Sequence, residues 1–345
     1  MVLLRRAPVG LAGAVALLSL VSCFRHRLVI DPPPRGAQAL SLLGDTLWSI
    51  RFPSMEGQVR VRRLVEAQRR ARTDPGDQAA QLLLGRRTAE MGRFREALEI
   101  YQTAIDADAT DARLWRRQGE LLLLLREPDR AADRLEQAVA RAKAHPSAKE
   151  FLESDDGGLV GTSILHGSYW LLGVAHYVRG DLRRSLEAFG EAARTASNAD
   201  EAANTAVWLF FLLHQHGRRA EAAEIVRAFP ADAPVISSGA EQRLLLALRG
   251  DVSYDSLRRE TLSAAPETEN LYRYGLAVGL MSSDESTGGE MLRDLVRLGA
   301  WGNLVAVAAE AELARRAAPC PGPLPRLPAE RRWNRCRTTK MPRPS

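Results

Sequence analysis

Cysteine is scarce in this chain, which has three in 345 residues. So few thiols exclude a small scaffold stapled by disulfides. Glycine and proline, with 26 and 18 residues, are close to their average frequencies, and this excludes a collagen-like or globally disordered chain. With 46% hydrophobic residues, the chain can bury a sizeable core, either as one elongated domain or as two compact ones.

Motifs of catalysis and phosphate binding are absent as well. The patterns G-x-S-x-G, H-E-x-x-H and G-x4-G-K do not occur. His214 and His216 are two positions apart on an expected helix, which points them to different sides and argues against a shared metal ion. His176 is expected to pack in the core. We therefore predict a protein that is not an enzyme and that binds no metal or cofactor.

The net charge of +6 is unevenly distributed. Residues 1–22 contain two arginines and no acid, and residues 315–345 contain nine basic residues and one acid, which leaves −4 for residues 23–314. The body of the protein is therefore mildly acidic, although the whole chain is basic. This distribution argues against a nucleic acid partner.

The N-terminus has the features of an export signal. Arg5 and Arg6 precede 16 uncharged residues, Ala7 to Ser22. A permanent membrane-spanning helix needs about 20 apolar residues. The shorter run is typical of a signal peptide that is removed from the mature protein, and an uncleaved anchor is the alternative.

The end of this run, Leu20-Val21-Ser22-Cys23, resembles the lipobox of bacterial lipoproteins. The resemblance implies cleavage before Cys23 and acylation of that residue, and two or three acyl chains hold a protein stably on a membrane. Phe24 stands where an aspartate retains enterobacterial lipoproteins in the inner membrane, so the outer membrane is favoured. The expected location is the periplasmic side of a bacterial membrane. An ordinary signal peptide followed by a chance cysteine remains the alternative.

A 34-residue periodicity is the strongest signal in the body of the chain. The offset that relates Gly85 to Gly119 also relates Ala97 to Ala131 and Tyr101 to Leu135. This pattern resembles the tetratricopeptide repeat (TPR), a helix–turn–helix unit. The resemblance implies an all-α TPR-type solenoid that forms a right-handed superhelix and is degenerate at both ends. The best repeats are 78–111, 112–145 and 166–199, and a weaker copy is 203–236.

Small and aromatic residues at matching positions carry this resemblance. The small residues are expected where two helices approach closely, and the large ones between repeats. The signature residues are Gly85, Ala97, Ala104, Trp115, Gly119, Ala131, Ala138, Gly173, Phe189 and Ala192. Further helices are expected at 59–72, 241–249, 271–281, 288–298 and 304–315.

The predicted domains follow from these features. Residues 1–22 are the signal peptide, 23–45 the lipid anchor and a proline-rich spacer, and 46–316 the repeat domain. Residues 317–345 form a basic, proline-rich tail that is expected to be disordered, although Cys320 and Cys336 could pair in an oxidising periplasm. The acidic insertion at 146–165 lacks the spacing of a calcium loop, and we expect a solvated loop or a short hairpin there.

A TPR solenoid binds partners in a concave groove that is lined by the first helix of each repeat. Transfer of the family's groove positions gives Arg86, Glu90, Arg113, Arg116, Glu120, Trp170, Tyr177, Phe211 and His214. Such a groove is charged at one end and aromatic at the other, which suits an extended peptide or helix. Packing of the aromatic residues inside a degenerate repeat is the alternative. The predicted function is a lipid-anchored adaptor for a protein or peptide of the cell envelope, and the alternative is a lipoprotein that binds an apolar small molecule for periplasmic transport.

Overall fold

The computed structural model describes residues 35–50, 52, 54–153, 159–281, 283–297 and 301–317. All of them belong to residues 33–345, one of the two units into which the chain divides. Cys23, the predicted signal peptide and most of the predicted tail lie outside the described residues. Within the described ranges, no helix has the length and the apolar character needed to cross a membrane.

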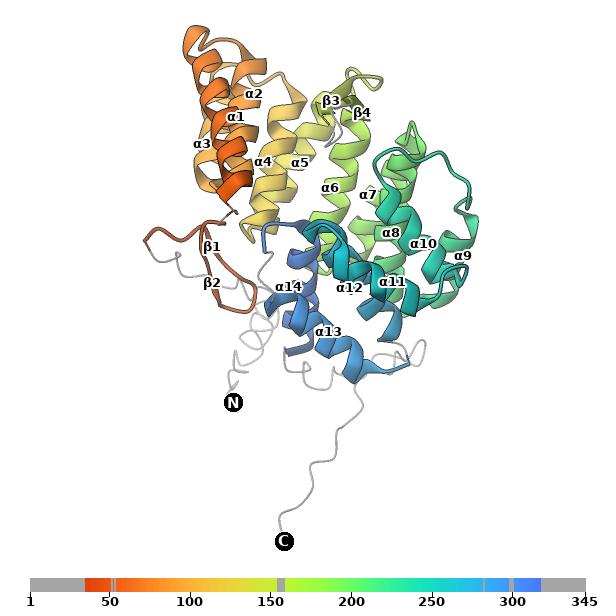
Figure 1. The fold of residues 1–345 in the computed structure, drawn as a ribbon. Helices are drawn as coiled ribbons and strands as arrows, with labels where there is room; N and C mark the ends of the chain where they lie inside the picture. The colour runs from red at the N-terminus through yellow and green to blue at the C-terminus, as the bar shows by residue number, and fades with distance from the viewer. Residues whose placement is uncertain are drawn as a thin grey trace, which may run out of the picture. The chain divides into compact units, whose positions relative to one another are not determined.

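Helices dominate the described part of the chain, and they follow one another as antiparallel pairs (Figure 1). The paired helices are α1 (Ser54–Thr73), α2 (Gln78–Glu90), α3 (Phe94–Ala107), α4 (Ala112–Leu124), α5 (Pro128–Ala142), α6 (Ile164–Arg179), α7 (Leu182–Thr195), α8 (Ala199–Gln215) and α9 (Arg219–Ala228). The predicted all-α helix–turn–helix solenoid is therefore confirmed, and α1 forms the half-repeat at its start.

The remaining helices lack the repeat pattern. They are α10 (Gly239–Arg249), α11 (Tyr254–Glu260), α12 (Pro266–Leu280), α13 (Glu285–Arg297) and α14 (Leu304–Ala317), with a 3₁₀ turn at Thr261–Ser263. The sequence did not predict α11. The last helix, α14, turns back and packs against α4, α6 and α12.

Two short hairpins complete the described structure. β1 (Ala39–Leu40) pairs with β2 (Thr46–Leu47), and β3 (Lys149–Glu153) pairs with β4 (Leu159–Ser163). The second hairpin occupies the acidic insertion. The first one belongs to the folded body, because Leu42 donates its backbone N–H to Glu310 of α14 over 3.0 Å. The fold thus includes residues that the sequence assigned to the spacer before residue 46.

Local sequence explains where the repeat helices begin. The side chains of Asp77, Asp111 and Ser163 accept backbone N–H groups in the first turns of α2, α4 and α6. Such N-caps satisfy donors that a helix leaves unpaired. Asp181 and Asn198 do the same for α7 and α8.

Left-handed residues occupy the turns inside the repeats. Gly92, Gly180 and Gly217 have φ of 70°, 74° and 73°, a conformation that costs glycine little. Arg126 stands 34 positions after Gly92 and adopts φ 63° without being a glycine. The buried ion pair that this arginine makes with Glu310 accounts for its presence at such a position.

The signature glycines lie where the two helices of a repeat touch. A Cβ atom at Gly85 would stand 2.1 Å from the ring of Tyr101, and one at Gly119 would stand 2.4 Å from Leu135 Cγ. In the third repeat the same relationship joins Gly173 to Phe189, at 2.5 Å. The signature alanines Ala97, Ala104, Ala131, Ala138 and Ala192 are all buried, and Trp115 is buried as well.

Candidate functional site

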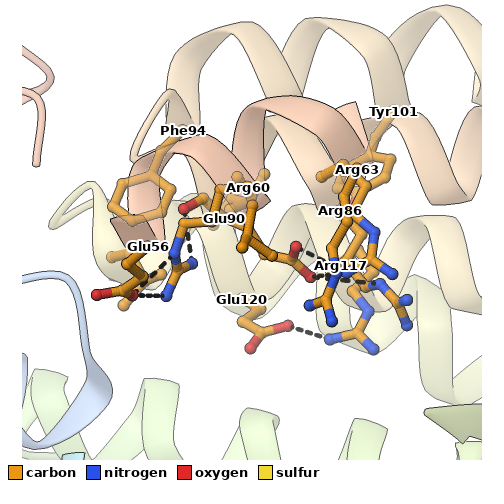
Figure 2. Close-up of a pocket in the computed structure, with 14 residues that line it drawn as sticks. Glu56, Arg60, Arg63, Arg86, Glu90, Phe94, Tyr101, Arg117 and Glu120 are labelled. Atoms are coloured by element: carbon orange, nitrogen blue, oxygen red, sulfur yellow. Dashed lines mark hydrogen bonds and ion pairs between the residues drawn. The ribbon is translucent and has the colours of Figure 1, made fainter. Parts of the chain in front are cut away.

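A cavity of about 630 Å³ opens between α1, α2 and α4 (Figure 2). We call it the arginine cavity. Three of the predicted groove residues, Arg86, Glu90 and Glu120, line it. The other charged side chains on its wall are Glu56, Arg60, Arg63, Arg87 and Arg117. Val59, Ala89, Phe94, Tyr101, Leu121 and Leu124 supply the apolar part of the wall.

The helical period explains how α1 contributes to this wall. Glu56, Val59, Arg60 and Arg63 follow the spacing i, i+3, i+4 and i+7, so they share one face of α1. The same spacing places Arg86 and Glu90 together on α2. The residues of α1 could not be predicted from the sequence, because a half-repeat has no consensus positions from which a groove can be transferred.

Arginines outnumber glutamates in the arginine cavity, five to three, which gives an excess of two positive charges. Glu56 pairs with Arg60 at 2.6 Å, and Glu90 pairs with Arg87 at 2.8 Å and with Arg86 at 3.6 Å. Arg63 has no hydrogen bond or ion pair among the described residues. Figure 2 shows Arg63, Arg86 and Arg117 together on one side of the cavity.

Arg117 lies between two acids. Its guanidinium contacts Glu120 at 2.8 Å and Glu150 of β3 at 3.0 Å. Burial disfavours its charge, but Glu120 and the other negative groups nearby outweigh this effect and hold its pKa above the ordinary value. Arg117 is therefore a fixed cation in the wall. The sequence predicted its neighbours Arg113 and Arg116 for the groove and missed Arg117.

Arg86 is less well compensated than Arg117. Burial, followed by repulsion from Arg87, lowers its pKa below the ordinary arginine value, and the distant contact with Glu90 opposes this only partly. A guanidinium in this situation is stabilised by any further anion that enters the cavity. The electrostatics of the cavity therefore favour a carboxylate or a phosphate.

Arg113 and Arg116 lie away from the arginine cavity. Arg113 forms an ion pair with Asp111, the N-cap of its own helix, at 2.7 Å. Arg116 is buried and forms an ion pair with Glu150. The two arginines therefore hold local structure, Arg113 at the start of α4 and Arg116 at the contact between α4 and the β3–β4 hairpin.

The predicted aromatic end of the groove is covered by the chain itself. Tyr177 and Phe211 are almost completely buried, at 1% and 0% exposure. The ring of Phe211 packs edge-on against Tyr274 of α12, with 4.9 Å between ring centroids. Arg315 of α14 lies over the ring of Tyr177. Helices α12 and α14 thus occupy the place that the sequence left open for a partner.

Trp170 and His214 also contact this chain. Trp170 packs edge-on against Trp208, with 5.9 Å between ring centroids, and His214 lies 5.4 Å from the ring of Phe210. Burial lowers the pKa of His214. The structure therefore divides the predicted groove residues into three groups. Arg86, Glu90 and Glu120 line the open cavity, and Arg113 and Arg116 hold local structure outside it. Trp170, Tyr177, Phe211 and His214 pack against other side chains of this chain.

The described residues offer little else for chemistry. Among them, no group of three or more His, Cys, Asp and Glu side chains is placed to hold a metal ion. His166 contacts the backbone carbonyl of Ala192 at 2.9 Å, and burial lowers its pKa. Its surroundings are those of a packed core residue.

No known family model matches the chain, and no curated protein matches its sequence. Several solved structures are similar to it. MamA is 16% identical, and the match covers 51% of this chain and 92% of MamA, with a TM-score of 0.37. YrrB, described as a TPR protein with an unusual peptide-binding site, covers 72% of this chain and 97% of its own length at 12% identity, with a TM-score of 0.38. A tetratricopeptide repeat protein from Parabacteroides merdae is 11% identical, and the match covers 75% of this chain and 94% of that protein, with a TM-score of 0.46.

Proposed function

We propose that this protein is a lipid-anchored adaptor that binds an acidic segment of another envelope protein in the arginine cavity. The observation that carries the proposal is the excess of arginine in that cavity, together with the guanidinium of Arg63, which has no hydrogen bond or ion pair within the described residues. Binding of an anion there neutralises charges that the fold leaves uncompensated.

The lining of the cavity supports a peptide as the ligand. Apolar side chains such as Val59, Phe94 and Leu121 form its wall together with the charged ones. A peptide that carries both acidic and apolar side chains can use both kinds of contact. The charged wall also favours this ligand over the apolar small molecule of the alternative function.

The anchor and the location rest on the sequence alone. The lipobox resemblance at Leu20-Val21-Ser22-Cys23 supports acylation of Cys23, and the export signal supports a location on the periplasmic side of a bacterial membrane. In this proposal the acyl chains hold the solenoid at the membrane, and the arginine cavity recruits the partner.

A direct test uses a short fluorescein-labelled peptide in which glutamate alternates with leucine, and a matched peptide with glutamine in place of glutamate. Fluorescence anisotropy should show binding of the acidic peptide only. The double substitution Arg63→Ser/Arg86→Ser should weaken it at least about tenfold, equivalent to about 1.4 kcal/mol. Added salt should weaken it further.

Arg62 provides the matched control, because it is exposed on the same helix and does not line the cavity. The substitution Arg62→Ser should leave the affinity unchanged. Equal affinity for the two peptides, or equal losses for Arg62→Ser and Arg63→Ser, would refute the proposal. A photo-crosslinking residue at position 63, compared with position 62, then tests whether the native partner is joined through an acidic segment.

A further inference from the structure

A second cavity, of about 710 Å³, lies between the β1–β2 hairpin, α13 and α14. Its wall combines apolar and aromatic side chains with two arginines. Trp301 separates it from the arginine cavity, because this ring packs edge-on against Phe94, with 5.3 Å between ring centroids. The two cavities are therefore distinct and can have different ligands.

Large apolar side chains are exposed at the rim of this second cavity. Trp48 is 54% exposed and Leu43 is 40% exposed, and both belong to the β1–β2 hairpin segment. Trp301, Val296 and Leu313 are half-buried beside them. Exposed apolar side chains that gather at one place indicate a surface that contacts another body.

Arginines border the same apolar rim. Arg293 and Arg297 of α13 line the cavity and are exposed. Arg293 has no hydrogen bond or ion pair among the described residues, and Arg297 makes only an exposed contact of 3.4 Å with Asp294. Two acids also line the cavity. The charge of Glu310 is neutralised by the buried ion pair with Arg126, and the exposed Asp45 of the hairpin leaves an excess of one positive charge. Tryptophan beside arginine is the composition of protein surfaces at the headgroup level of a membrane.

The rim includes residues near the start of the described part of the chain, which follows the predicted site of acylation in sequence. A Cβ atom at Gly36 would stand 3.8 Å from the ring of Trp48, so Trp48 lies where the N-terminal segment joins the fold. Gly36 is 13 positions after Cys23, and a segment of this length spans at most about 45 Å. The strongly basic segment after residue 317 follows α14, whose Leu313 lines the same cavity.

We propose that Leu43, Trp48, Arg293 and Arg297 form a membrane-contacting surface that rests on anionic lipid. The inference rests on the lipid anchor of the proposed function. The apolar side chains enter the headgroup region, and the arginines pair with lipid phosphates. The contact fixes the orientation of the solenoid on the membrane, which acyl chains alone do not do.

The test places an environment-sensitive fluorophore on the surface of the acylated, full-length mature protein. Leu43→Cys is labelled in a Cys320→Ser/Cys336→Ser background, since the thioether at Cys23 blocks that thiol. Ile236→Cys in the same background is the control, because Ile236 is 83% exposed and does not line this cavity. The protein is bound to vesicles of phosphatidylcholine, with and without phosphatidylglycerol.

The expected result is a blue shift and a severalfold rise in emission at position 43 on anionic vesicles, and no change at position 236. Arg293→Glu/Arg297→Glu should abolish the response while co-sedimentation with the vesicles persists. Co-sedimentation without a response at position 43 would refute the proposed membrane-contacting surface and leave the lipid anchor supported. A blue shift at position 43 that depends on protein concentration and needs no vesicles would refute the membrane contact and indicate self-association.

If the protein does not sediment with pure phosphatidylcholine, the anchor itself is wrong. The response of position 43 to anionic vesicles then shows separately whether the proposed surface contacts anionic lipid. Binding of the acidic peptide, measured in the same samples, reports separately on the arginine cavity.

Discussion

The hydroxyl groups of Tyr177 and Tyr274 lie 2.5 Å apart, and both side chains are buried. Tyr177 belongs to α6 in the third repeat, and Tyr274 belongs to α12 beyond the repeats. Burial raises the pKa of both phenols, so each is neutral and one donates to the other. This hydrogen bond joins the repeats to the helices that cover their aromatic residues.

Removal of both hydroxyls should therefore destabilise the protein by less than the sum of the two single removals. Tyr274→Phe or Tyr177→Phe leaves a buried hydroxyl without this partner, which costs about 1 to 3 kcal/mol. The double variant leaves neither, and its loss should be smaller than the sum of the two single losses. Urea denaturation of the four proteins measures this coupling, and strictly additive losses would contradict it.

The buried ion pair between Arg126 and Glu310 predicts a large loss of stability when either partner is replaced. Glu310→Gln leaves the fully buried guanidinium of Arg126 with a neutral partner, and such a change should cost about 3 to 5 kcal/mol of unfolding free energy. Arg126→Gly also loses the pair but relieves the backbone at φ 63°. It should be about 1 kcal/mol more stable than Arg126→Ala. Equal stability of these two variants would show that the backbone conformation changes.

The contact between Gly119 and Leu135 predicts a contrast between two glycines of the helices. Gly119→Ala places a Cβ atom against Leu135 and should destabilise the protein by about 1 to 3 kcal/mol. Gly190→Ala is the matched control, because nothing lies within 4 Å of a Cβ atom there. It should stabilise α7 by up to about 1 kcal/mol through helix propensity. Thermal unfolding measures both, and in the double variant the losses from Gly119→Ala and Leu135→Ala should be less than additive.

His176 predicts a dependence of stability on pH. Burial, followed by repulsion from Arg179, lowers its pKa to about 4, whereas an unfolded histidine titrates near 6.5. The folded state thus binds the proton more weakly than the unfolded state. Neutral His176 therefore favours the folded state in full above about pH 6.5, and this stabilisation is lost as the pH falls toward 4. It amounts to about 2 to 3 kcal/mol. His176→Leu should flatten this part of the stability profile, and an unchanged slope would count against it.

The fold class could be predicted from the sequence because the same pairs of contacting positions recur in each copy of the 34-residue repeat. Gly85 and Tyr101, or Gly119 and Leu135, are 16 residues apart in each copy, and their sizes complement each other. Periodicity describes only contacts between neighbouring repeats. It contains no information about α14, which contacts helices far from it in sequence.

The candidate site could be predicted only in part for the same reason. Family positions transfer to α2 and α4 and give Arg86, Glu90 and Glu120, which line one cavity. They do not transfer to α1, so Arg60 and Arg63 were missed. They also cannot show that Tyr177 and Phe211 are covered, because α12 and α14 have no repeat consensus. Whether the cavity residues bind a partner stays a prediction.

The return of α14 has a consequence for the order in which the protein folds. Arg126 and Glu310 are 184 positions apart, whereas an open repeat array can nucleate anywhere and grow from neighbour to neighbour. Contacts of such high contact order form slowly. During synthesis, the side chains of α4 and α6 that α14 covers stay exposed until this helix emerges. A chain truncated before residue 301 would leave them exposed permanently.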